Sequence, residues 1–269
     1  MMTSLTWLTI LAYGASFGFY VASLYGRKAF IARGATALLG LGIVFQYFAL
    51  LERRAVHAVP YQDLYGSMSL FGWLLAVTYL SLELYHRQRS VGAFVLPFVL
   101  VLFLAAHLSP ATPLAGPPAR GTAFALHVTL SILAYAAFTL SFVLSLMFLA
   151  QDRLLRVHKM GGAFWRLPPL ELLERMSRSS VLIGLISIFA GTIFGFVWVD
   201  RLKGSVGGGD IKHIVTLVVF GLYAAYLFLS RTAAWRGARA SILCALNFVL
   251  VVLSFTVVNV YLSHYHRYF

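Results

Sequence analysis

Long runs of apolar residues, separated by short polar segments, dominate the sequence. Eight of these runs are long enough to cross a bilayer, which takes about 20 mostly apolar residues per helix. They cover approximately residues 4–24, 35–51, 65–84, 91–108, 122–149, 180–199, 213–230 and 241–262. None of them alternates between apolar and polar positions as the strands of a transmembrane barrel do. The pattern therefore predicts an all-α polytopic membrane protein, in which residues 1–269 form a single transmembrane domain with eight membrane-spanning helices. The first run follows no basic residue and precedes no small-residue cleavage site, so we expect a retained helix rather than a signal peptide.

The composition excludes most other classes of protein. The 269 residues are 61% hydrophobic and 11% charged, with a mean hydropathy of +0.86. Soluble domains have roughly 45–50% apolar and about 25% charged residues, so this chain has too few charges to cover a soluble globule. A soluble enzyme, a disordered protein and a coiled coil are excluded. Cys244 is the only cysteine, which also excludes a disulfide framework, a cysteine-rich metal site and a CxxCH motif for covalent haem attachment.

The basic residues indicate how the helices are oriented in the membrane. The 21 Lys and Arg residues outnumber the 8 Asp and Glu residues, which gives a net charge of +13. In a soluble protein this excess would indicate nucleic-acid binding. Here 14 of the 21 basic residues lie in the loops after the first, third, fifth and seventh runs. Short basic loops stay in the cytoplasm, so we expect these loops to be cytoplasmic and both termini to lie on the outer side. The expected partner of the basic residues is membrane lipid and not nucleic acid.

The longest of the predicted cytoplasmic loops contains an amphipathic segment. Pro168 and Pro169 are typical of a helix start. Leu170, Leu173 and Met176 then follow at helical spacing on one face, with charged residues largely on the other face. This pattern predicts a helix that lies along the inner leaflet; a surface for docking another protein is the alternative.

Histidines collect on the predicted outer side. Six of the eight fall in outer loops or at outer helix ends: His57, His107, His127, His213, His264 and His266. Ionisable residues in membrane segments are usually functional. Two neutral imidazoles from different helices suit the axial positions of haem iron, whereas a zinc site would require a closely spaced set such as HExxH, which is absent. A histidine at a membrane boundary is also commonly a plain interfacial residue, so ligand, relay and interfacial roles all stay open for His57, His107 and His213.

Five groups of short motifs occur in a fixed order over about residues 57–269. They are HAVP at 57–60 with DLYGS at 63–67 and Trp73; His127 with LAY at 133–135; LPPLELLER at 167–175; IGL at 183–185 with Gly191 and Gly195; and YAAYL at 223–227 with WRG at 235–237, Asn259 and HRY at 266–268. In content and order, these motifs resemble those of the cytochrome c assembly family of haem-handling membrane proteins (the CcsA, CcmC and HemX-like group).

The resemblance implies a membrane protein that holds haem b without a covalent bond, at its outer face, through two histidines. Matched motif by motif, the ligands of the haem iron are His127 and His266, with His264 as the alternative to His266. A loop between the two histidines covers the haem in this family. It corresponds here to about residues 199–212, where Asp210 and Lys212 match family positions and His213 occupies the position of a glutamate.

The chain also departs from the family pattern. The covering loop lacks its tryptophans, and Phe228 stands where the family has a histidine within the membrane. These departures resemble the divergent HemX-like branch. We expect a multi-pass protein of the bacterial inner (cytoplasmic) membrane that handles haem for cytochrome c-type biogenesis, with haem and other cytochrome c maturation or haem-synthesis proteins as partners. The alternative is a HemX-like regulator of haem biosynthesis that acts through the basic loop Asp152–Arg178. Since the sequence contains no evident activated nucleophile or carboxylate pair, we do not expect the chain to be an enzyme by itself.

Overall fold

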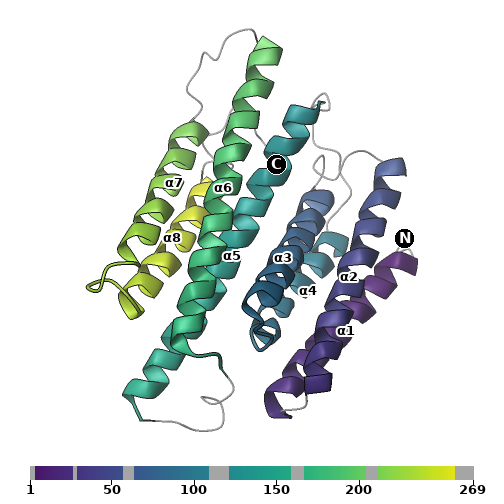
Figure 1. The fold of residues 1–269 in the computed structure, drawn as a ribbon. Coiled ribbons are helices and arrows are strands. Elements are labelled where there is room, and N and C mark those ends of the chain that lie inside the picture. The colour runs from purple at the N-terminus through teal and green to yellow at the C-terminus, as the bar shows by residue number, and fades with distance from the viewer. Residues whose placement is uncertain are drawn as a thin grey trace.

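The computed structural model is all-helical, as the apolar runs predict. It describes residues 4–26, 29–56, 64–108, 121–158, 167–203 and 211–257. Within these ranges there are eight α-helices, and each coincides with one predicted run (Figure 1). Their bounds are α1 Ser4–Tyr25, α2 Ala29–Val56, α3 Leu64–His86, α4 Gly92–Leu108, α5 Thr122–Arg156, α6 Leu170–Lys203, α7 Ile211–Leu229 and α8 Ala238–Val257.

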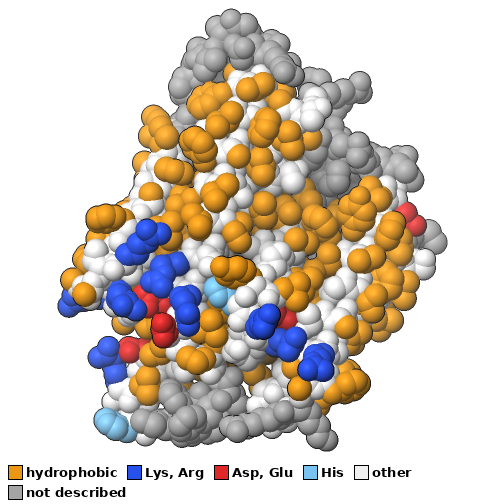
Figure 2. Space-filling view, in the orientation of Figure 1, with side chains coloured by type: hydrophobic (Ala, Val, Ile, Leu, Met, Phe, Trp, Pro, Cys, Tyr) orange, Lys and Arg blue, Asp and Glu red, His pale blue; other side chains and the backbone are white. Residues whose placement is uncertain are grey.

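Most of these helices are suited to a bilayer by both length and composition. Five are long and apolar enough to span one, over Ser4–Tyr25, Ala29–Glu52, Tyr65–His86, Thr122–Arg156 and Leu170–Val199. Three shorter apolar helices accompany them, over Gly92–Leu108, Ile214–Leu229 and Ala238–Ser254. Large apolar side chains such as Leu11, Ile186 and Phe228 are exposed on the outside, and they cover much of the face shown in Figure 2. An apolar exterior of this extent is stable in lipid and not in water, so the chain is a membrane protein.

The helices pack as two groups that share α5 and α6. One hydrophobic core joins α1 to α4 with α5 and the start of α6, and a second core joins α5 to α8. α5 and α6 lie side by side at the centre (Figure 1). Small residues on α6 let the two helices approach closely: Gly184 lies against the ring of Phe138, and Gly191 against Ser131.

The amphipathic segment at 170–178 is not a separate helix on the inner leaflet, so that prediction is wrong. It forms the first turns of α6 and continues without a break into the membrane-spanning part. The start after Pro169 is as predicted, because the Pro169 carbonyl accepts the first backbone hydrogen bonds, from Leu172 and Leu173. No proline follows in the sequence to end the helix before the span. Leu173 and Met176 are buried in the first core, and Glu174, expected on the polar face, is buried as well.

Arginines gather at one end of the bundle. The described members of this group are Arg33, Arg87, Arg89, Arg153, Arg156, Arg175, Arg178, Arg231, Arg236 and Arg239. They belong to the turns and helix ends that connect α1 to α2, α3 to α4, α5 to α6 and α7 to α8, and Figure 2 shows arginine side chains in a band at this level. We call this end the basic end. His107 and His127 lie at the opposite end, near the end of α4 and the start of α5.

Candidate functional site

The imidazole of His127 is fixed by a hydrogen bond across the central helix pair. His127 lies in the second turn of α5, and its Nδ1 is 2.7 Å from the backbone carbonyl oxygen of Gly191 on α6. A carbonyl oxygen only accepts, so Nδ1 carries the proton and donates it. In the neutral ring the lone pair is then on Nε2. Metal-binding histidines are typically oriented in this way, with the nitrogen remote from the metal donating to a carbonyl or carboxylate.

Two glycines on α6 make room for this ring. A Cβ atom on Gly195 would lie 2.7 Å from Nδ1 of His127, closer than real Cβ contacts. A Cβ on Gly191 would lie 3.3 Å from both the Leu130 Cβ and the Ser131 Oγ. The two glycines are four residues apart, so they lie on the same face of α6. The sequence motif containing Gly191 and Gly195 therefore shapes the contact between α6 and the His127 turn.

Aromatic side chains adjoin this contact. Trp198 lies three residues after Gly195 on α6, and its ring centroid is 4.6 Å from that of Phe124 on α5. The indole Nε1 of Trp198 is buried and has no hydrogen-bond partner among the described residues. Burying an N–H donor without an acceptor is unfavourable by about 1–3 kcal/mol. This region therefore combines the His127 imidazole, the aromatic surface of Phe124 and Trp198, and an indole N–H that has no acceptor among the described residues.

His107, the other described histidine at this end, has both ring nitrogens in hydrogen bonds. Its Nδ1 donates to the Phe103 carbonyl oxygen one turn earlier on α4, at 2.8 Å. Its Nε2 therefore accepts from the hydroxyl of Tyr65 on α3, at 2.9 Å. In this structure His107 ties α4 to α3, which favours a structural role among those left open by the sequence.

The remaining predicted site residues are described less fully or not at all. His57, Asp210, His264 and His266 lie outside the described residues. Lys212 and His213 lie in the first turn of α7, but their side chains are outside the described part of the structure. Among the described side chains, no group of three or more His, Cys, Asp and Glu residues could hold a metal ion. The pairing of His127 with a second histidine therefore remains a prediction.

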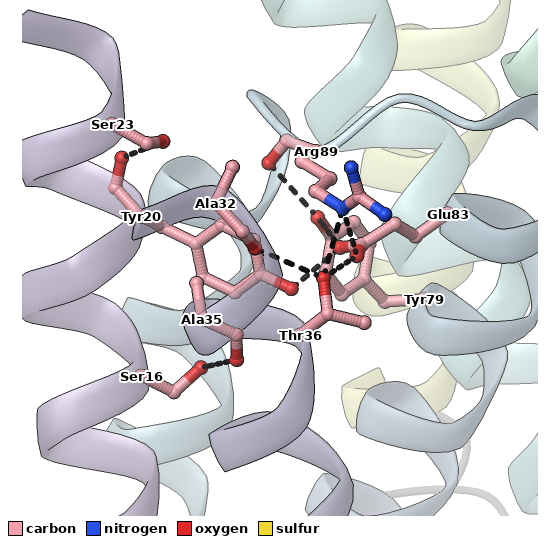
Figure 3. A network of polar contacts seen from close by, with 9 residues as sticks. All are labelled: Ser16, Tyr20, Ser23, Ala32, Ala35, Thr36, Tyr79, Glu83 and Arg89. Carbon is pink, nitrogen blue, oxygen red and sulfur yellow. Dashed lines mark hydrogen bonds and ion pairs between the residues drawn. The ribbon is translucent and has the colours of Figure 1, made fainter. Parts of the chain in front are cut away.

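Sequence reasoning missed a buried carboxylate near the basic end. Glu83 on α3 is 1% exposed, and its Oε2 accepts hydrogen bonds from the hydroxyls of Tyr20 at 2.5 Å and Tyr79 at 2.6 Å. The Thr36 hydroxyl donates to Oε1, and the Arg89 Nε forms an ion pair with the same oxygen at 3.8 Å. Figure 3 shows these side chains converging from α1, α2, α3 and the segment before α4. One signal could have identified Glu83, namely an acidic residue within an apolar run, because such residues are costly unless paired.

The single cysteine lies in a hydroxyl-lined part of the second core. Cys244 on α8 is fully buried, and its thiol donates to the Ser141 Oγ on α5 at 3.4 Å. The Ser177 Oγ on α6 lies 3.9 Å from the same sulfur and 3.0 Å from the Tyr226 hydroxyl on α7. These contacts connect four helices through small polar groups. Cys244 is thus packed as part of the core and is not presented to solvent.

Comparisons with known proteins agree with the motif pattern. The family model for cytochrome C assembly protein matches residues 61–266. A cytochrome c biogenesis protein CcsA from Gloeobacter violaceus is 28% identical, covering 88% of this chain and 86% of its own length. The CcsA protein of Mesostigma viride is 26% identical over 91% of both chains. Protein HemX of Brevibacillus brevis is 26% identical over 92% of both chains.

Proposed function

Because the chain belongs to the cytochrome c assembly protein family, we propose that it is a membrane haem-binding protein of cytochrome c-type biogenesis. The bound group is haem b, held without a covalent bond at the end of the bundle opposite the basic end. The names of its relatives, which include cytochrome c biogenesis protein CcsA and Protein HemX, support a role in cytochrome c biogenesis. The chain acts as a carrier or assembly component and does not catalyse a reaction by itself.

The observation that carries this proposal is the hydrogen bond from His127 to Gly191. It leaves Nε2 as the lone-pair nitrogen of the ring, which is the atom that an axial ligand of haem iron uses. His266 would be the second histidine that holds the iron, with His264 as the alternative. Bound haem would supply an iron centre that histidine nitrogens can ligate and an amphipathic macrocycle with carboxylate groups.

The described residues fit such a group. A macrocycle fits beside aromatic rings such as those of Phe124 and Trp198, and a haem carboxylate would supply the acceptor that the Trp198 indole lacks among the described residues. Asp210, Lys212 and His213 are the proposed contacts from the covering loop. Cys244 is buried in the second core, which agrees with a haem that is not covalently attached.

The orientation in the membrane follows from the basic end. Loops rich in Lys and Arg stay in the cytoplasm, so the basic end faces the cytoplasm, and the His127 site and both termini face the outer side. In a bacterium the proposed haem site would then be at the outer face of the inner membrane. The partners at that site are haem and other proteins of cytochrome c maturation.

An absorption spectrum tests the haem site. The full chain is purified in mild detergent from cells supplied with haem, beside the variants His127→Ala and His266→Ala and the matched control His158→Ala at the basic end. We expect a low-spin spectrum typical of two histidine ligands in the parent and the control. Each single variant should lose the low-spin bands while retaining part of the haem, and the double variant should lose haem. A parent without haem bands, or bands that persist in the double variant, would overturn the proposal.

A second candidate function is supported by the similarity to HemX over almost the whole chain. The chain would then regulate haem biosynthesis through the basic loop Asp152–Arg178. Part of this loop is not available to a partner protein in the structure. Leu173 and Met176 are buried, and Glu174 and Arg178 are paired with each other at 3.1 Å. Crosslinking from the exposed Arg175 position distinguishes the two functions. Partners found only on the opposite side of the membrane would exclude the regulatory function.

A further inference from the structure

An apolar crevice lies between α1, α4 and α5, in the part of these helices nearest the basic end. Its volume is about 490 Å³. Tyr25 from α1, Phe94 and Phe98 from α4, and Leu146 and Ala150 from α5 contribute to its lining. Among the described residues, the lining contains no charged side chain. The crevice is remote from the proposed haem site, which lies at the other end of α5.

The crevice is open to the surroundings of the bundle. Tyr25 is 69% exposed, Leu146 44% and Phe98 42%, whereas the deeper Val143 and Met147 are buried. In a membrane protein these outward-facing apolar side chains contact lipid tails. The contents of the crevice therefore come from the bilayer, and its walls fit a hydrocarbon chain.

A guanidinium group extends the same face of α5 toward the basic end. The lining residues of α5 recur at helical spacing, and Arg153 follows Ala150 by three residues and Leu146 by seven. It therefore lies almost in line with Leu146, two turns further along the helix. Arg153 is exposed. The adjacent acid, Asp152, is paired with Arg156 at 2.7 Å, and no ion pair within the described part of the chain includes Arg153.

We propose that this crevice binds an anionic phospholipid, with one acyl chain between α1, α4 and α5 and the phosphate at Arg153. The apolar lining recognises the chain, and the exposed guanidinium at the basic end recognises the headgroup charge. Each arginine that borders a membrane-spanning helix raises the affinity for anionic lipids about fivefold. The site is independent of the proposed haem site and does not depend on that assignment.

Native mass spectrometry of the full chain tests the lipid site. The delipidated protein is titrated with phosphatidylglycerol and, separately, with phosphatidylcholine that has the same acyl chains. Ala150→Phe places a ring in the crevice at an exposed position, and Arg153→Gln removes the charge. The matched controls are Ala225→Phe, at an exposed position of α7, and Arg231→Gln, at the basic end beyond α7. Thermal unfolding of all variants checks that they fold.

We expect one phosphatidylglycerol to remain bound to the parent and to both controls. Ala150→Phe should lose it, and Arg153→Gln should weaken its retention about fivefold and remove the preference over phosphatidylcholine. Equal retention in Ala150→Phe and the parent would overturn the proposal, and so would haem in place of lipid in the crevice. A phosphatidylglycerol with a photoreactive acyl chain gives a second readout on the unaltered parent. Labelling in residues 143–150 supports the site, and labelling confined to α7 or α8 contradicts it.

Discussion

His127 on α5 and Gly191 on α6 are 64 residues apart in sequence and are joined by a 2.7 Å hydrogen bond from an imidazole nitrogen to a backbone carbonyl. The bond determines which ring nitrogen carries the proton, and it does so without any side chain on α6. A substitution at Gly191 therefore leaves the acceptor in place and alters only the space around it. The helix pair itself is thus the element that orients the proposed iron ligand.

Gly195→Ala is expected to displace the His127 ring. The new Cβ would lie 2.7 Å from Nδ1 in the present geometry, and overpacking of this kind typically destabilises by about 1–3 kcal/mol. The low-spin haem spectrum should weaken, together with the thermal stability. Gly221→Ala is the control, since a Cβ there meets no atom within 4 Å. An unchanged spectrum in Gly195→Ala would show that the close contact does not orient the ring.

Trp198→Phe should lower haem retention more than it lowers the stability of the haem-free protein. The change removes the buried indole donor, which has no acceptor among the described residues, and keeps an aromatic ring beside Phe124. If haem supplies the acceptor, retention should fall by about five- to tenfold, which corresponds to one hydrogen bond of about 1–1.5 kcal/mol. Haem dissociation to an apo-globin acceptor measures this change. Equal haem retention in the variant and the parent would show that Trp198 does not contribute to the haem site.

Tyr65→Phe tests the assignment of His107 as a structural residue. Removing the hydroxyl leaves Nε2 of His107 without the hydrogen bond that it accepts at 2.9 Å. We expect a loss of about 1 kcal/mol in unfolding free energy and no change in the haem spectrum. Loss of the low-spin bands in His107→Ala would instead make His107 an iron ligand.

Glu83→Gln should destabilise the first group of helices. The neutral amide has one oxygen, which can accept from the hydroxyls of Tyr20 and Tyr79. Its NH₂ group would face the Thr36 hydroxyl and the Arg89 guanidinium. At least one buried contact is therefore lost. We expect a loss of about 1–3 kcal/mol in unfolding free energy in detergent. Glu171→Gln is the matched control, because its pair with Arg175 is exposed and spans 4.0 Å. Equal effects of the two substitutions would show that the Glu83 network contributes no more than a surface pair.

The helices were predictable from sequence because membrane spans depend on average hydropathy over about 20 residues. Each apolar run became one helix for this reason. The start of α6 was less predictable, because a short amphipathic stretch has the same pattern whether it lies on lipid or packs on protein. Leu173 and Met176 meet a core formed partly by α3 and α4, and sequence periodicity does not report that partner.

The sequence identified some residues of the candidate site but did not predict how they contact one another. His127 was identified by its place in a motif, and the same motif pattern contained Gly191 and Gly195. Their contact with the imidazole depends on how α5 and α6 are aligned along their axes, which a single sequence does not specify. Glu83 was missed because one acidic residue changes the mean hydropathy of a run very little, although it is buried and hydrogen-bonded to Tyr20 and Tyr79.

The burial of Cys244 has a practical consequence for topology mapping. It is the only thiol of the chain and is packed among Ser141, Ser177 and Tyr226, so membrane-impermeant maleimides should not label the parent protein in intact cells. New cysteines can then be introduced one at a time without first replacing the native one. A cysteine at the exposed Ala233 in the turn before α8 and one at the exposed Thr122 at the start of α5 would each report, by labelling or protection, the side of the membrane to which that end of the bundle is exposed.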